Sequence, residues 1–262
     1  MTALGFWGIG VLRQEWQLFL LAVQFLTRLP VPQELPYSDD LAIRSARYYP
    51  LVGLGVGGVG AGVLLTAGLV LSWPVAVLLS MGATLLLTGA FHEDGLADAA
   101  DGLWGGATPE RALEIMRDSR LGTYGAVALA MMLSLKAAIL MALSPTDATV
   151  LLIAGHTLGR MACVHVIATT QYARDVGTKF VAPRVTADGY RVAFATSLAV
   201  VVMVTLWIGG VAAGSAVVVC VALAQLFRLI FVRKLGGYTG DCLGGVQQLA
   251  EVGLYLGAAA WL

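Results

Sequence analysis

Residues 50–91 read PLVGLGVGGVGAGVLLTAGLVLSWPVAVLLSMGATLLLTGAF, an apolar stretch that contains no charged side chain. A helix of about 20 apolar residues is long enough to cross the hydrocarbon core of a bilayer. The stretch divides at Ser72-Trp73-Pro74, because a proline inside a helix removes a backbone hydrogen bond and favours a turn. It therefore predicts two membrane-spanning helices, at about 50–72 and 73–91, joined by a tight turn.

The composition extends this prediction to the whole chain. Of its 262 residues, 58% are hydrophobic and only 12% are charged, and the mean hydropathy is +0.83. These values exclude an ordinary soluble protein, so the lipid bilayer is the first expected partner. The formal net charge is zero, and without a basic field we expect no nucleic acid partner. Cys163, Cys220 and Cys242 lie too far apart in sequence to indicate zinc or a disulfide framework.

Further apolar runs lie at about 122–143, 148–169, 192–212, 215–232 and 243–262. Residues 12–29 are also apolar, but polar residues such as Arg13 and Glu15 interrupt them, which is typical of an interfacial or re-entrant helix. We therefore predict an all-α fold, a polytopic membrane helical bundle with six or seven transmembrane helices and this N-terminal helix. It would form a single integral-membrane domain over residues 1–262.

The basic residues predict the orientation. Twelve of the sixteen Lys and Arg residues fall in loops at alternate ends of the apolar runs: Arg28, Arg44, Arg47, Arg111, Arg117, Arg120, Arg174, Lys179, Arg184, Arg191, Arg233 and Lys234. The short loops at the opposite ends contain none. Because cytoplasmic loops are enriched in Lys and Arg, we expect the charged loops on the cytoplasmic side of the membrane.

An acidic segment, FHEDGLADAADG at residues 91–102, follows the opening stretch and holds four of the sixteen acidic residues. In a helix, Asp94, Asp98 and Asp101 stand at i, i+4 and i+7, within about 60° of one another on one face. Carboxylates at this density, with Glu93 beside them, favour Mg²⁺ or Mn²⁺. The alternative is a solvated acidic loop between two membrane helices.

The sequence Gly55–Gly60 (GVGGVG) matches the GxGxxG pattern of dinucleotide sites. That pattern needs a preceding strand and a βαβ unit, and here it lies inside an apolar run. We expect instead that Gly53, Gly57, Gly58 and Gly62 let neighbouring helices approach closely.

Charged residues within the apolar runs are the rarer signal. Lys136, Arg160 and Arg228 should face the bundle interior or a polar cavity, because a charge in hydrocarbon is costly. For Arg160 and Arg228 the alternative is a side chain that reaches toward the cytoplasmic membrane surface. For Lys136 a structural ion pair and an anion-binding role remain equal alternatives. His156 and His165 are expected to be hydrogen-bonded core residues.

Two polar clusters are further candidates for a site. Residues 118–125 (DSRLGTYG) place a carboxylate, a guanidinium and hydroxyls at a helix entrance, where free backbone N–H groups favour phosphate. Residues 236–245 (GGYTGDCLGG) place Asp241 in a glycine-rich loop that allows a ligand to approach the backbone. Either cluster alone could be a plain turn.

Together these motifs resemble the membrane-bound cobalamin (5′-phosphate) synthase family, adenosylcobinamide-GDP ribazoletransferase. The matching segments run in the family's order over nearly the whole chain: Phe25–Pro32 (FLTRLPVP), Tyr49–Gly53 (YPLVG), His92–Gly102, Met116–Gly125 (MRDSRLGTYG), Lys136 and Gly237–Gly244 (GYTGDCLG). Glu93 departs from the family, which usually has a neutral residue there, and this leaves open which acids bind metal.

The resemblance implies a catalytic domain for the last steps of cobalamin biosynthesis, in a bacterial inner membrane with its active site on the cytoplasmic face. Its substrates would be adenosylcobinamide-GDP and α-ribazole or α-ribazole 5′-phosphate. The ribazole 3′-hydroxyl would attack the phosphorus attached to cobinamide, giving adenosylcobalamin or its 5′-phosphate and releasing GMP. Mg²⁺ is the expected cofactor. A homodimer, or contact with other enzymes of cobalamin assembly, is a further expectation.

The resemblance also implies roles for particular residues. Metal ligands are expected among Glu93, Asp94, Asp98 and Asp101, and catalytic carboxylates among Asp94, Asp98, Asp101, Asp118 and Asp241. Asp118 or Asp241 would complete the metal shell or accept the hydroxyl proton. Substrate-binding residues are expected to be Arg117, Ser119, Arg120, Thr123, Lys136, Tyr238 and Thr239, the cations holding phosphate oxygens.

Two other functions fit parts of the pattern. A CDP-alcohol phosphotransferase also clusters aspartates on membrane helices, but its DG-x-x-AR motif is not met, since Asp98-Ala99 follows Asp94-Gly95-Leu96-Ala97 without an arginine. A transporter would suit the intramembrane charges, but no inverted repeat of the acidic motif is present.

Overall fold

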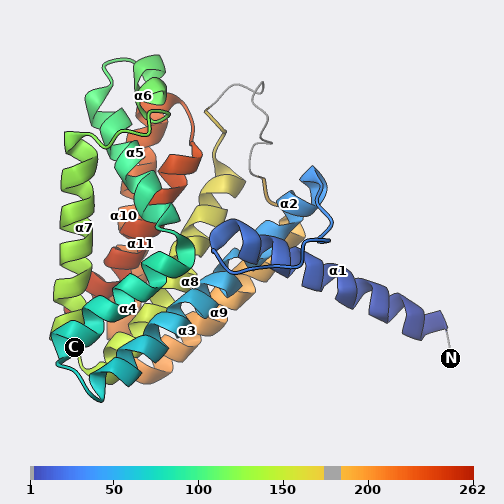
Figure 1. Cartoon of the computed structure of the whole chain (residues 1–262), viewed down its shortest axis with the longest axis horizontal. Helices are drawn as coiled ribbons and strands as arrows, with labels where there is room; N and C mark the ends of the chain where they lie inside the picture. The colour runs from blue at the N-terminus through green and yellow to red at the C-terminus, as the bar shows by residue number, and fades with distance from the viewer. Residues whose placement is uncertain (1–2, 174–183) are drawn as a thin grey trace.

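The computed structural model describes residues 3–173 and 184–262, and for residues 3–9 the helical backbone alone. Helices dominate this part of the chain, and its only β contact is an isolated bridge between Tyr172 and Tyr238 (Figure 1). The elements are α1 (Ala3–Leu26), α2 (Asp39–Ser45), the 3-10 helix η1 (Ala46–Tyr48), α3 (Tyr49–Gly68), α4 (Trp73–Thr88), α5 (Phe91–Gly105), α6 (Pro109–Ile115), α7 (Thr123–Ala142), α8 (Pro145–Thr169), α9 (Ala187–Ile208), α10 (Gly210–Leu235) and α11 (Gly240–Ala259).

Polar residues in the loops set where several of these helices begin. In each case a Ser or Thr hydroxyl accepts a hydrogen bond from a backbone N–H in the first turn, as Ser38, Thr108, Ser144, Thr186 and Thr239 do for α2, α6, α8, α9 and α11. Proline occupies the first turn of α3, α4, α6 and α8, where its missing N–H has no helical partner to lose.

Five segments are long and apolar enough to cross a membrane: 39–68, α7, α8, α9 and α10. The pair α4 and α5, bent by 85°, makes a sixth if it counts as one broken span. The predicted polytopic helical bundle is therefore confirmed. Two predicted spans differ in detail. The run 73–91 yields only the 16-residue α4 before the bend, and the run 243–262 yields α11, which is not among the candidate spans.

Helix α11 is instead the central helix of the bundle. It packs against α10, α5 and α8 and also contacts α7. Almost every residue from Cys242 to Ala258 is buried, including the polar Gln247, Gln248 and Glu251. These three side chains lower the hydropathy of the segment, and their burial requires partners from the surrounding helices.

Helices α3 and α8 pack closely through two of the four glycines predicted to do so. A Cβ on Gly53 would lie 2.3 Å from the backbone oxygen of His156, and one on Gly57 would lie 2.6 Å from the Cα of Ile153. Around Gly58 and Gly62, in contrast, no described atom lies within 4 Å of such a Cβ. The expectation is thus confirmed for Gly53 and Gly57 and wrong for the other two.

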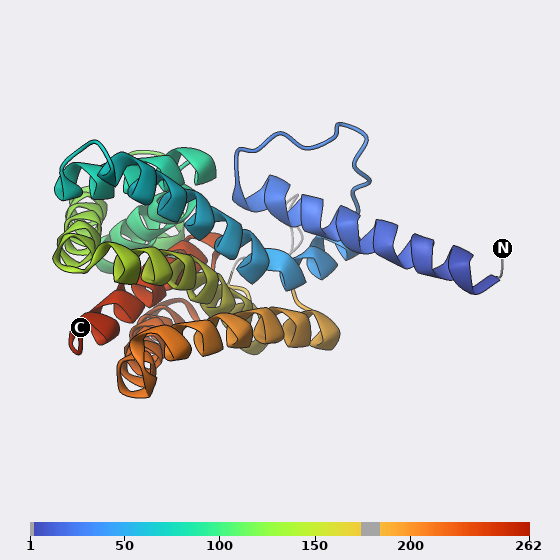
Figure 2. The ribbon, with the colours of Figure 1, turned by 90° about the horizontal axis from the view of Figure 1, so that it is seen from below.

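Helix α1 extends away from the bundle, with the N-terminus at its far end (Figures 1 and 2). Its second half is held by Glu15, which accepts hydrogen bonds from Arg47 at 3.0 Å and from the Tyr48 hydroxyl at 2.8 Å. It is not among the helices that meet the length and hydropathy of a span.

Candidate active site

The acidic segment forms helix α5 and is not the solvated loop that was the alternative. The chain enters it through a sharp bend at Gly89 and Ala90, whose φ angles are +68° and +54°. Phe91, Asp94 and Asp98 then stand at i, i+3 and i+7, so they share one face of the helix. Asp94 is exposed and Asp98 half-buried, whereas the opposite residues pack into the bundle.

Asp101 has a structural task that the sequence did not reveal. It is 7% exposed, and its two carboxylate oxygens accept hydrogen bonds from the N–H groups of Gly122 at 2.7 Å and Gly125 at 2.9 Å. It thereby caps the start of α7 from a neighbouring helix. Both glycines are needed, because a Cβ on either would lie 2.4 Å from an Asp101 oxygen.

The start of α11 lies against the acidic helix. A Cβ on Gly95 of α5 would be 3.1 Å from the backbone oxygen of Asp241 and 3.2 Å from the Cα of Gly244. Asp98 follows Gly95 by three residues and so lies one turn along the same side. The structure thus brings Asp98 and Asp241 to the same junction between two helices.

Tyr238 and Thr239, in the loop just before α11, are buried. Tyr238 is 1% exposed, and its backbone bonds to Gln171 and Ala173 at 2.9 Å each. Burial raises the pKa of its phenol above the usual value. The Thr239 hydroxyl is fully buried and accepts the N–H of Cys242 at 3.2 Å as the cap of α11. Tyr238 and Thr239, both predicted to bind substrate, therefore stabilise the loop before α11 in this structure.

The loop before α7 carries the second predicted cluster. Asp118 accepts hydrogen bonds from the Arg120 side chain, with Nε 3.0 Å from each carboxylate oxygen. This contact lowers the pKa of Asp118 to about 2. Arg117, Ser119 and Thr123 are exposed beside the pair. These groups lie directly before or at the α7 start that Asp101 caps, so they lie at one end of the acidic helix.

Glu93 faces away from Asp94, toward the bundle interior. Its Oε1 accepts a hydrogen bond from Gln248 of α11 at 2.8 Å, and its Oε2 is buried without a hydrogen-bond partner. The four carboxylates predicted as metal ligands therefore face different surroundings: Asp94 and Asp98 the outer face of α5, Glu93 the interior, and Asp101 the start of α7.

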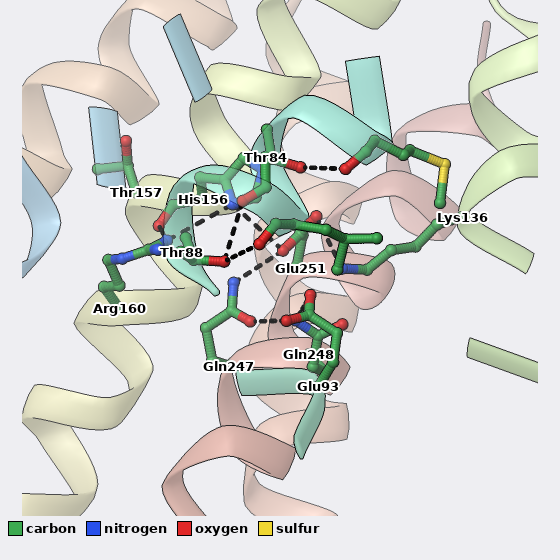
Figure 3. A network of polar contacts seen from close by, with 12 residues as sticks. Thr84, Thr88, Glu93, Lys136, His156, Thr157, Arg160, Gln247, Gln248 and Glu251 are labelled. Atoms are coloured by element: carbon green, nitrogen blue, oxygen red, sulfur yellow. Dashed lines mark hydrogen bonds and ion pairs between the residues drawn. The ribbon is translucent and has the colours of Figure 1, made fainter. Parts of the chain in front are cut away.

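Glu93 borders a buried polar network that Figure 3 shows. At its centre Glu251 of α11 forms an ion pair with Lys136 of α7 at 2.9 Å, both side chains being at most 5% exposed. Glu251 also accepts hydrogen bonds from Gln247 at 2.7 Å and from the Tyr255 hydroxyl at 3.0 Å. The structure thus contains the ion pair, one of the two alternatives for Lys136.

Two residues of α8 complete this network. The His156 Nδ1 lies 3.5 Å from Glu251, and Arg160, which is 1% exposed, donates to the backbone oxygen of His156 at 2.9 Å. Glu251 was not among the predicted residues. The signal that could have found it is Lys136 itself, because a buried cation calls for a carboxylate, and Glu251 is the one acidic residue in the run 243–262.

In residues 3–173 and 184–262, no three His, Cys, Asp or Glu side chains are arranged to hold a metal ion. Mg²⁺ usually keeps several waters and binds through one or two carboxylates plus substrate phosphates. Asp94 and Asp98, on one face of α5, supply that donor chemistry.

Comparison with known proteins finds relatives that match nearly the whole chain. A curated Ralstonia pickettii protein named adenosylcobinamide-GDP ribazoletransferase is 44% identical over 97% of this chain and 99% of its own length. Vibrio cholerae and Shewanella frigidimarina proteins of the same name are 42% and 43% identical, covering 97% and 93% of this chain and 97% and 94% of their own. No solved structure matches. The sequence profile described as cobalamin-5-phosphate synthase matches residues 18–259, and the chain therefore belongs to that family.

Proposed function

We propose that this protein is a membrane transferase that joins adenosylcobinamide-GDP to α-ribazole or α-ribazole 5′-phosphate and releases GMP. The observation that carries this proposal is the exposed face of α5, where Asp94 and Asp98 lie beside the start of α11 in a chain of this family. The products would be adenosylcobalamin or its 5′-phosphate. The site would work on the cytoplasmic face of a bacterial inner membrane, as the Lys and Arg distribution favours.

In the reaction, the ribazole 3′-hydroxyl oxygen forms a bond to the phosphorus attached to cobinamide. The bond from that phosphorus to the bridging oxygen breaks, and this oxygen leaves with GMP. The hydroxyl proton passes to a carboxylate; Asp241, whose backbone lies against Gly95 of α5, would accept it. Catalysis of this type depends mainly on positioning and on neutralising phosphate charge.

Asp94 and Asp98 would hold Mg²⁺, which supplies positive charge to the diphosphate oxygens. Arg117, exposed in the loop before α7, would hold a phosphate oxygen, and Ser119 and Thr123 would donate hydrogen bonds. Arg120 is engaged by Asp118, so its task is to fix the loop that presents them.

The test is GMP release by the purified protein in detergent, given adenosylcobinamide-GDP and α-ribazole with Mg²⁺ or with EDTA. We expect metal-dependent GMP and cobalamin, and loss of both by at least about a hundredfold in Asp94→Asn, because a removed metal ligand withdraws charge stabilisation. Glu110→Gln, an exposed carboxylate of α6 outside the site, is the matched control. Folded protein that forms no GMP with any divalent metal would exclude this function.

A further inference from the structure

A cavity of about 620 Å³ lies between α1, α2, η1 and the bend that joins α4 to α5. Ligand pockets in proteins commonly have volumes of about 300–1,000 Å³, so this one is large enough for a nucleotide. None of the predicted site residues lines it, yet one wall is Phe91, the first residue of the acidic helix. Figure 2 shows α1 and the loop that follows it at one side of the bundle.

Aromatic rings form much of the cavity wall. Phe25 stacks on Tyr49 with ring centroids 5.7 Å apart, and it meets Phe91 edge to face at 5.4 Å. Tyr37 contributes a fourth ring from the loop before α2. Phe25 and Phe91 are 52% and 42% exposed, so ring surface remains accessible. Such rings favour a flat aromatic ligand, which stacks on them or meets their edges.

The same cavity holds unpaired positive charge. Arg28 and Arg184 line it, and in the part of the chain that the structure describes neither forms an ion pair with a carboxylate. The Arg28 guanidinium lies directly on the bend, because a Cβ on Gly89 would be 2.3 Å from its Nε. An exposed guanidinium at this position suits a phosphate group. Asp39, exposed at the cavity wall, could accept hydrogen bonds from sugar hydroxyls.

The acidic face of α5 begins next to the cavity. Phe91 lines the cavity, and Asp94 and Asp98 follow it on the same face at i+3 and i+7. The distance from Phe91 to Asp94 along the axis is about 4.5 Å, at a rise of 1.5 Å per residue. A phosphate held at the α5 side of the cavity would therefore lie beside the carboxylates.

We propose that this cavity binds a flat bicyclic base together with its ribose phosphate, and so positions one of the two nucleotide-like substrates for transfer at Asp94 and Asp98. The proposal rests on the proposed function. Two sources have this chemistry, the benzimidazole nucleotide of the acceptor and the guanosine nucleotide of the donor, and both offer rings for Phe25 and Phe91 and a phosphate for Arg28.

The test measures equilibrium binding of α-ribazole 5′-phosphate and, separately, of GMP to the full chain in detergent by calorimetry. Ala42→Trp fills the cavity, and Leu41→Trp, at the neighbouring position outside the lining, is its control. Arg28→Gln removes the guanidinium, and Arg13→Gln, an exposed arginine of α1, is its control. We expect Arg28→Gln to weaken binding of one ligand by about tenfold or more, the effect of losing a charge-assisted hydrogen bond.

Ala42→Trp should weaken the same ligand, and the two controls should bind it like the wild type. Loss for α-ribazole 5′-phosphate alone would identify the acceptor site, and loss for GMP alone the donor site. Wild-type binding of both ligands that neither cavity variant alters would overturn the cavity proposal, while wild-type GMP release would still support the proposed function. Binding that the cavity variants weaken, without any product in the turnover assay, would support the cavity proposal and contradict the proposed function.

Discussion

Lys136 and Glu251 form an ion pair in the interior of the bundle, where each charge needs a partner. Both side chains are nearly inaccessible, and Lys136 lies in a helix apolar enough to cross a membrane. Taking each charge out of water is costly, and the pair offsets that cost through its 2.9 Å contact and the added hydrogen bonds of Gln247 and Tyr255. Removing one partner leaves the other charge buried alone.

We predict that Lys136→Met lowers the free energy of unfolding by about 3–5 kcal/mol, because Glu251 becomes an uncompensated buried charge. Adding Glu251→Gln should restore part of the loss, since the two effects are coupled. Equilibrium unfolding in detergent measures both, with Lys234→Met at the end of α10 as the control. A Lys136→Met protein with wild-type stability but no turnover would instead favour the phosphate-binding alternative.

The sequence identified one member of this pair and missed the other. Lys136 stands out because a lysine in an apolar run is rare, whereas Glu251 lies in a run that also holds two glutamines and reads as mildly polar. Their contact depends on how α7 and α11 pack, which residue spacing within either helix does not specify.

At the scale of the helix, Asp101 joins α5 to α7. We predict that Asp101→Ala lowers the free energy of unfolding by about 1–3 kcal/mol, because the N–H groups of Gly122 and Gly125 lose their acceptor. Asp94→Ala should leave the melting temperature unchanged and abolish turnover, since Asp94 is exposed. Thermal melting and GMP release, measured on both variants, separate the two roles. Equal melting temperatures would contradict the capping role of Asp101.

Helices α3 and α8 give a second prediction at this scale. Gly53→Ala should destabilise the protein by about 1–3 kcal/mol, because the new methyl group meets the backbone of His156 and the helices must separate. Gly58→Ala, five residues further along α3 and facing open space, should be neutral or slightly stabilising. Unfolding midpoints in detergent compare the two. A neutral Gly53→Ala would mean that the helices are packed less closely.

The glycine pattern predicted that α3 packs closely, but it did not identify which glycines are in contact. Small residues occur around much of the helix, so the pattern does not specify the face. The position of the neighbouring helix α8 determines which glycines are in contact, and of the four predicted glycines only Gly53 and Gly57 meet it. The acidic spacing was more informative: once the segment is helical, the spacing places Asp94 and Asp98 on one face of α5. The separate surroundings of Glu93 and Asp101 depend on neighbouring helices.

For the whole molecule, the distribution of basic residues predicts which ends of the bundle face the cytoplasm. The three native cysteines are buried, so an introduced cysteine reports its own position. We predict that a membrane-impermeant maleimide labels Thr146→Cys, in the first turn of α8, in intact cells. It should label Ala107→Cys, between α5 and α6, only after the cells are permeabilised. Both positions are exposed. The opposite result would invert the topology and place the acidic helix outside.

The overall architecture could largely be predicted from apolar runs alone, because five of them are long enough to define spans independently. The exceptions are α4, α5 and α11. The bend at Gly89 turns one apolar run into a short helix and directs the next away from it by 85°. The polar side chains of α11 are tolerated because they are surrounded by protein rather than lipid.

The position of α11 has a consequence for how the protein is made. Every helix that surrounds it precedes it in the chain: α5, α7, α8 and α10. Translation therefore produces the surrounding helices before the central one. A segment carrying Gln247, Gln248 and Glu251 gains little from entering lipid alone. Its insertion depends on contacts with the helices that are already in place, including the ion pair between Lys136 and Glu251. Until that final docking, the newly made protein would hold a partly open, charged interior that quality-control proteases in the membrane can recognise.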